Sequence, residues 1–129
     1  MAKKKAEVKL KSWGIYTPWD SESRALPRLL KVTREIPCEL EVEFGYIVNI
    51  KKAKNRKLQY CINHPNIPDA EGEPMAPFAG EVYIKQNDWD FFIGDTVWEP
   101  LENKQGPWRI TLAIDGTLVA DETFNLVLP

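Results

Sequence analysis

Hydrophobic and polar residues alternate along the segment 39–50. One parity carries only apolar or aromatic residues, namely Leu40, Val42, Phe44, Tyr46, Val48 and Ile50, and the other carries Glu39, Glu41 and Glu43. A period of two is typical of a strand with one buried face and one solvent-facing side. The segment therefore predicts an antiparallel sheet that covers a core on one side.

Further segments with this period predict the other strands. We expect them at 6–17, 29–36, 57–64, 81–86, 90–97, 108–114 and after residue 117. In the first of them the apolar parity changes between Leu10 and Trp13, which predicts a bulge near Ser12 or a bend at Gly14. Seven or eight short strands without a convincing amphipathic helix predict an all-β sandwich.

Two turns decide how these strands pair. If the chain turns near Lys54, segments 39–51 and 57–64 form a hairpin with Ile50 opposite Leu58. At Asp115-Gly116, a plain two-residue turn would place Leu118 on the solvent face. We therefore favour a three-residue loop with a bulge at Gly116, which leaves Glu122 as the awkward inward residue of the last strand.

The chain has two cysteines, Cys38 and Cys61. The hairpin register separates them by about 30 Å along the strand, far beyond the reach of a disulfide. Two free thiols indicate a reducing compartment. We see no secretory signal and no apolar run long enough to span a bilayer, so we expect a cytoplasmic protein.

Composition indicates one globular domain. The 129 residues are 43% hydrophobic and 28% charged, and the formal net charge is −2. We expect a flexible basic tail over residues 1–5 and a single domain over 6–129. Since no basic field covers the whole chain, nucleic acid is an unlikely partner.

Several short motifs occur in an order that resembles a known family. They are the strand 39–50, Asn63-His64-Pro65, Trp98-Glu99, Gly106-Pro107-Trp108 and the closing run 118–124. In this order they resemble the bacterial domain-of-unknown-function family 3859, from about Val8 to Val127. The resemblance implies an immunoglobulin-like antiparallel sandwich and supplies neither an activity nor catalytic residues.

No complete catalytic or metal-binding set is visible. His64 is the only histidine, and we interpret it as a partly buried structural residue rather than a base or ligand. Asp88 and Asp90 share one face of a strand, and Asp95 follows, but nothing indicates a substrate cleft between them. We therefore expect a protein that is not an enzyme and needs no cofactor or metal.

Two groups of residues are candidate binding sites. The first is a basic turn with five cations, Lys51, Lys52, Lys54, Arg56 and Lys57. It could face an anion or an acidic protein, although a solubilising turn is the simpler interpretation. The second comprises Trp13, Trp19 and Trp89, which lie near loops or strand ends, where an exposed ring could stack on a sugar or anchor a protein.

A third candidate surface is the connection 65–80. It is rich in proline and glycine and contains Asp69, Glu71 and Glu73. From these features we expect a binding module that contacts a protein partner through the basic turn, this connection or an open sheet edge. An open edge would also allow a homodimer. The alternative is a sandwich that binds a small ligand or a carbohydrate through exposed tryptophans.

Overall fold

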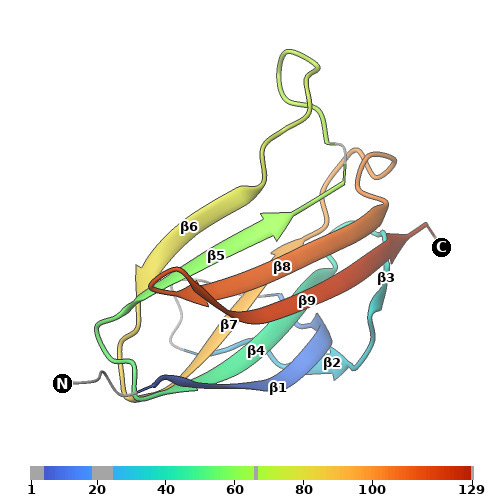
Figure 1. The fold of residues 1–129 in the computed structure, drawn as a ribbon. Helices are drawn as coiled ribbons and strands as arrows, with labels where there is room; N and C mark the ends of the chain where they lie inside the picture. The colour runs from blue at the N-terminus through green and yellow to red at the C-terminus, as the bar shows by residue number, and fades with distance from the viewer. Residues whose placement is uncertain (1–4, 19–24, 66, 129) are drawn as a thin grey trace.

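Two β-sheets face each other around one apolar core (Figure 1). The computed structural model describes residues 5–18, 25–65 and 67–128, so most of the expected basic tail and Trp19 lie outside the described residues. The four-stranded sheet has the order β2-β1-β4-β7 and the five-stranded sheet has the order β3-β9-β8-β5-β6. The strands are β1 (Glu7–Tyr16), β2 (Leu29–Lys31), β3 (Glu35–Pro37), β4 (Glu43–Lys51), β5 (Lys57–Asn63), β6 (Phe78–Tyr83), β7 (Asp88–Thr96), β8 (Gly106–Ile114) and β9 (Thr117–Val127).

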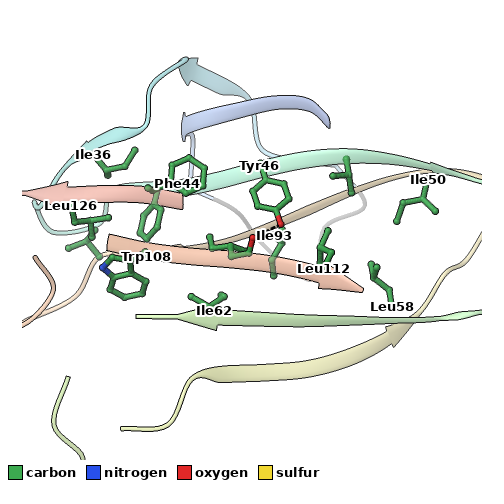
Figure 2. Packing of buried hydrophobic residues seen from close by; sticks show 14 of the residues in the cluster. Ile36, Phe44, Tyr46, Ile50, Leu58, Ile62, Ile93, Trp108, Leu112 and Leu126 are labelled. Carbon is green, nitrogen blue, oxygen red and sulfur yellow. Dashed lines mark hydrogen bonds between the residues drawn. The ribbon is translucent and has the colours of Figure 1, made fainter. Parts of the chain in front are cut away.

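Strand β4 lies inside the four-stranded sheet and supplies much of the core, as its alternation predicts (Figure 2). Its inward side chains Phe44, Tyr46, Val48 and Ile50 are fully buried. The expected start of this strand was wrong, because the chain turns at Glu41, which has a φ of 68°. Leu40 is therefore 47% exposed, whereas Glu43 is only 5% exposed on the outer side of the sheet.

The expected hairpin between segments 39–51 and 57–64 was also wrong. Strand β4 pairs with β1 and β7, whereas β5 pairs with β6 and β8 in the opposite sheet. The connection crosses from sheet to sheet, with positive φ angles at Lys52 and Asn55. The predicted inward side of segment 57–64 is nevertheless correct, because Leu58 and Ile62 point into the core. Both cysteines are free thiols, as expected.

The segment 29–36 forms two short strands instead of one. Strand β2 pairs with β1, and β3 pairs in parallel with β9 in the other sheet. The chain crosses closely over Gly14, where an added Cβ would lie 1.9 Å from the carbonyl oxygen of Lys31. The bulge expected near Ser12 is present, since the register of β1 and β4 shifts between Leu10 and Ser12.

The β8–β9 hairpin differs from the expected one in its turn. Ile114 pairs directly with Thr117, so the loop has two residues, and both have positive φ, as this tight turn requires. The extra residue is Val119, because Leu112 pairs with Ala120 and Ala113 pairs with Leu118. Leu118 is consequently 56% exposed, while Phe124 returns to the core. With β2 and β3 separate, the described residues form nine strands rather than seven or eight.

Candidate functional site

The cations of the basic turn are mostly paired within the molecule. Lys52 lies 2.9 Å from Glu7, Arg56 lies 2.7 Å from Asp115, and Lys57 lies 3.7 Å from Glu81. In the described residues, Lys51 and Lys54 have no carboxylate at ion-pair distance. These acids come from different strands and connections, which the sequence did not indicate. Three of the five cations of the turn thus have a carboxylate partner within the molecule.

The two described tryptophans of the candidate set are half-buried. The guanidinium of Arg34 lies 5.2 Å from the ring centre of Trp13. The ring of Trp89 packs against Phe91, with 5.2 Å between ring centres. These tryptophans belong to β1 and β7, which lie on opposite sides of β4, and both belong to the packing around the core. The fold therefore does not bring them together into one platform.

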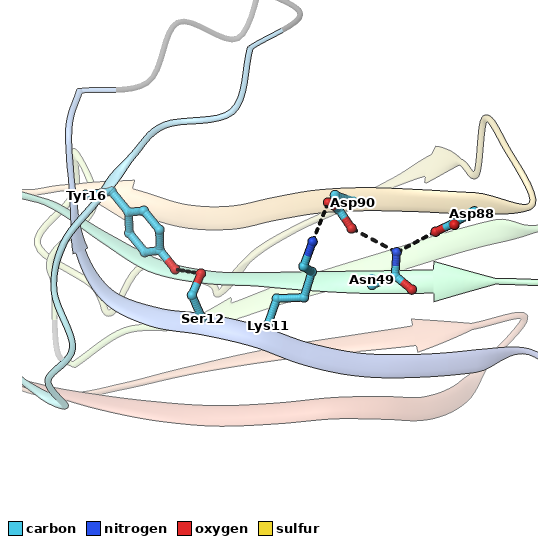
Figure 3. A network of polar contacts seen from close by, with 6 residues as sticks. All are labelled: Lys11, Ser12, Tyr16, Asn49, Asp88 and Asp90. Carbon is cyan, nitrogen blue, oxygen red and sulfur yellow. Dashed lines mark hydrogen bonds and ion pairs between the residues drawn. The ribbon is translucent and has the colours of Figure 1, made fainter.

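A polar network crosses the outer face of β1, β4 and β7 (Figure 3). The side-chain amide of Asn49 donates to Asp88 at 2.7 Å and to Asp90 at 2.9 Å, and Lys11 pairs with Asp90 at 2.9 Å. These two donors lower the pKa of Asp90. The network lines an open groove of about 620 Å³. Trp89 has the opposite parity on β7 from both aspartates, but it also lines this groove, as does Lys51 of the basic turn.

His64 has the structural role that we expected. Its Nδ1 lies 2.7 Å from the carbonyl oxygen of Pro65, and its Nε2 lies 2.9 Å from that of Ala76. Its ring packs 4.7 Å from Phe78. Both nitrogens are thus engaged by backbone. Within the described ranges, no group of three His, Cys, Asp or Glu side chains could hold a metal ion.

Asp95 is a partly buried carboxyl group whose pKa is raised. It lies on the inward parity of β7, opposite Phe44. Burial, with a smaller effect of Glu43, raises the pKa of Asp95 to about 6. Its Oδ1 accepts the backbone N–H of Thr96 at 2.8 Å. An inward carboxylate on an edge strand opposes the addition of another strand beside it, so the Asp95 end of β7 is disfavoured for strand addition.

The edge formed by β3 is closed by its own residues. The hydroxyl of Thr33 accepts the N–H of Glu35 at 3.1 Å and donates to its carbonyl oxygen at 3.0 Å. Pro37 has no N–H, and its carbonyl oxygen accepts the N–H of Glu39 at 2.9 Å. The backbone groups of β3 that face away from β9 are therefore satisfied, and this edge cannot pair with another strand.

Strand β6 forms the open edge of the five-stranded sheet. The N–H of Ile84 bonds to the carbonyl oxygen of Arg56, just before β5, and the register between β5 and β6 runs without a shift. Backbone groups alternate in direction along an antiparallel strand, so those of Ala79, Glu81 and Tyr83 point away from β5. No described residue bonds to them. Tyr83 is 61% exposed.

The sequence predicted an open edge as a candidate surface but did not indicate which strand forms it. It placed the start of this strand at residue 81, and the alternation over 78–83 was the only local signal. Whether β6 lies at an edge depends on which strands are its neighbours. The order of strands in the folded sheet decides this, and the local sequence does not. The remaining edge strand, β2, has only three residues. Its Leu30 side chain is 63% exposed.

Comparisons with known proteins agree with this architecture. In structure the chain is similar to an immunoglobulin-like protein from Pseudomonas aeruginosa, with a TM-score of 0.72 and 20% sequence identity. The match covers 94% of this chain and 97% of that chain. At this identity the likeness shows the fold alone, and the two sheets form an immunoglobulin-like sandwich. No curated protein matches the sequence.

Two further findings concern membrane-spanning segments and the protein family. In the part of the chain that the structure describes, no helix is long and apolar enough to cross a membrane. Residues 4–126 match the family described as a domain of unknown function, DUF3859. That match covers nearly the whole chain, and the chain therefore belongs to the DUF3859 family.

Proposed function

We propose that this domain is a protein-binding module that adds an extended segment of a partner to strand β6. The observation that carries the proposal is the row of outward backbone groups on Ala79, Glu81 and Tyr83, which have no bonding partner in the described residues. Such a row can form main-chain hydrogen bonds with any extended chain, and neighbouring side chains then select the sequence. The other long edge, β7, carries an inward carboxylate.

The charge around β6 favours a basic partner segment. Glu81 is exposed near the middle of the strand, and its 3.7 Å ion pair with Lys57 joins two exposed side chains, so it is weak enough to be exchanged for a cation of the partner. The preceding connection adds the exposed acids Glu71 and Glu73. Opposite charges on facing strands stabilise a pair, whereas like charges destabilise it. We infer a partner segment that places Lys or Arg opposite Glu81.

The charge of Glu81 also argues against a second copy of this chain as the partner that adds to β6. Only residues 79, 81 and 83 present outward backbone groups, so a symmetric antiparallel pair that uses all three must place Glu81 opposite Glu81 of the other copy. If one copy of β6 is shifted by two residues along the other, in one direction, Pro77 enters the ladder of hydrogen bonds. Pro77 has no N–H to donate there. A homodimer through β6 is thus less favourable than a basic partner.

The proposal includes binding without catalysis and a cytoplasmic location. Both nitrogens of His64 lie within hydrogen-bond distance of backbone carbonyl oxygens, which favours a structural role over a catalytic one. The free thiols of Cys38 and Cys61 fit a reducing compartment. The carbohydrate alternative gains no support from Trp13 and Trp89, because their rings are half-buried and belong to separate strands.

Titration of the ¹⁵N-labelled full chain with a peptide of alternating Lys and Val tests the proposal. We expect amide shifts at Ala79, Glu81 and Tyr83. Glu81→Pro removes an outward N–H without removing a bond to β5, and it should weaken binding by about tenfold or more. Glu81→Lys should reverse the preference toward an alternating Glu and Val peptide, whereas the control Glu39→Lys should not.

Either of two results would contradict the proposal. One is a set of shifts confined to another surface, such as the outer face of β1 and β4. The other is equal affinity for the basic peptide in Glu81→Pro and the unmodified chain, with both proteins folded. Circular dichroism of each variant establishes folding before the titration is interpreted.

A further inference from the structure

Gly80 lies in the middle of β6, directly opposite Tyr60 of β5. A Cβ added at Gly80 would lie 2.4 Å from the hydroxyl oxygen of Tyr60 and 2.6 Å from the ring carbon that carries it. The φ of Gly80 is not positive, so its backbone conformation does not call for glycine. The missing side chain instead leaves room for the end of the Tyr60 ring, which reaches across to β6.

The hydroxyl of Tyr60 is an available polar group at the end of an anchored ring. The ring is half-buried and packs against the core. The hydroxyl has no hydrogen-bond partner among the described residues. Among the same residues, no buried side-chain oxygen or nitrogen lacks a partner, so this hydroxyl must reach solvent.

The row of side chains that contains Tyr60 ends at the open edge of the sheet. Tyr60 lies between Leu112 of β8 and Gly80 of β6, on the side of the sheet that faces the core. Strand β6 is the last strand of this sheet, as Figure 1 shows. A strand that adds to β6 would therefore place one of its residues next in this row, beside the Tyr60 hydroxyl.

The geometry of an antiparallel pair decides which side chain can meet this hydroxyl. The backbone groups of Gly80 point toward β5, because those of Ala79 and Glu81 point away from it. An added residue opposite Gly80 therefore belongs to a non-hydrogen-bonded pair, in which the Cβ positions lie about 4.5 Å apart. Since the Tyr60 oxygen lies close to the Cβ position of Gly80, a hydroxyl on the partner's Cβ comes to about 3 Å from it.

We infer that Tyr60 selects threonine or serine opposite Gly80 in the segment that adds to β6. The inference rests on the proposed function and adds a second position to the chemistry of the partner. In an antiparallel strand the residue opposite Glu81 precedes the residue opposite Gly80. The partner segment thus carries Lys or Arg followed by Thr or Ser, and either hydroxyl of the Tyr–Thr pair can donate to the other.

Two peptides that differ at one residue test this selection. The first alternates Lys and Val, and the second has Thr in place of one central Val, with nearly the same side-chain shape. In NMR titrations of the ¹⁵N-labelled full chain, the Thr peptide should bind about three- to tenfold more tightly. Tyr60→Phe removes a hydroxyl that has no partner in the described fold, so the protein should fold and the preference should disappear.

Two further variants separate the position of the hydroxyl from other changes at this edge. Gly80→Ala places a Cβ where the Tyr60 hydroxyl lies, which should displace the ring end and abolish the preference for Thr, while the Val peptide still binds. Tyr83→Phe is the matched control, because Tyr83 is 61% exposed and has the opposite parity on β6. It should leave the preference unchanged.

The results distinguish failure of this inference from failure of the proposed function. If neither peptide binds the unmodified chain, both are overturned. If both peptides bind the unmodified chain equally, or if the preference for Thr persists in Tyr60→Phe, the inference alone is overturned and β6 remains the binding edge. Each preference is a ratio of two affinities measured on one folded protein, so a change in stability does not imitate its loss.

Discussion

The hydroxyl of Tyr46 donates a 2.8 Å hydrogen bond to the carbonyl oxygen of Ile110. Tyr46 lies on β4 and Ile110 on β8, so this bond joins two inner strands of facing sheets through the core (Figure 2). Both residues are fully buried. Burial, with smaller effects of Glu122 and Asp121, raises the pKa of Tyr46, so the hydroxyl keeps its proton and remains a donor.

Tyr46→Phe should therefore destabilise the fold while preserving its shape. The change leaves the Ile110 carbonyl oxygen without this partner in a dry environment, at a cost of about 1–3 kcal/mol. Urea unfolding monitored by tryptophan fluorescence measures this loss. Tyr83→Phe is the matched control, because Tyr83 is 61% exposed and the same change should be nearly neutral. Equal effects of the two substitutions would contradict a stabilising role for the bond.

The ion pair between Arg34 and Glu122 explains an acid on the inward parity of β9. These side chains are 2.5 Å apart, and the guanidinium lies 5.2 Å from the ring centre of Trp13 and 5.6 Å from that of Phe124. Arg34→Ala should lose about 2 kcal/mol or more, because it removes two cation–π contacts and leaves a partly buried carboxylate unpaired.

A double-mutant cycle with Glu122→Gln checks this interaction by chemical denaturation. We expect a coupling energy of about 1 kcal/mol or more, in keeping with a partly buried charge pair. Additive effects of the two substitutions would show that Arg34 acts through its aromatic contacts alone.

Asp95 should make stability depend on pH. Its folded pKa of about 6 is above its ordinary value of 3.8, so the folded state binds more protons than the unfolded state between these values. Stability should therefore fall as pH rises from about 4 to about 6. Asp95→Asn should lack this fall and gain about 1–3 kcal/mol relative to the unmodified protein above pH 6.

Denaturation at a series of pH values checks this expectation. The gain in Asp95→Asn relative to the unmodified protein should grow through the window between pH 4 and pH 6 and then level off. A constant difference across the series would mean that the Asp95 carboxyl titrates alike in the folded and unfolded states.

Phe44 in the core and Glu41 in the exposed turn before β4 provide a test of buried and exposed positions. Phe44→Glu should unfold the domain, because it removes about 1.5–3 kcal/mol of apolar burial and places an unpaired carboxylate in the core. Glu41→Gln should change stability by less than about 0.5 kcal/mol, since Glu41 is exposed. Thermal melts of both variants measure the effects, and similar melting temperatures would contradict the assignment.

Local alternation predicted the secondary structure well and the pairing of strands poorly. Phe44, Tyr46, Leu58 and Ile62 all point inward as expected, although the hairpin that was to join them does not exist. Parity depends on the pleat of each strand alone. Pairing depends on which neighbour completes a sheet, and the same apolar face can pack across the sandwich as well as along it.

Local patterning was enough to predict the all-β class, the inward parity of the central strands and the bulge in β1, and it favoured a structural role for His64. The ion pairs of the basic turn with acids such as Glu7 and Asp115, and the position of β6 at the edge of its sheet, follow only from the folded sandwich. The difference lies in the range of the interactions. Pleat and turn geometry act between near neighbours in sequence, whereas ion pairs and sheet edges join residues that only the closed sandwich brings together.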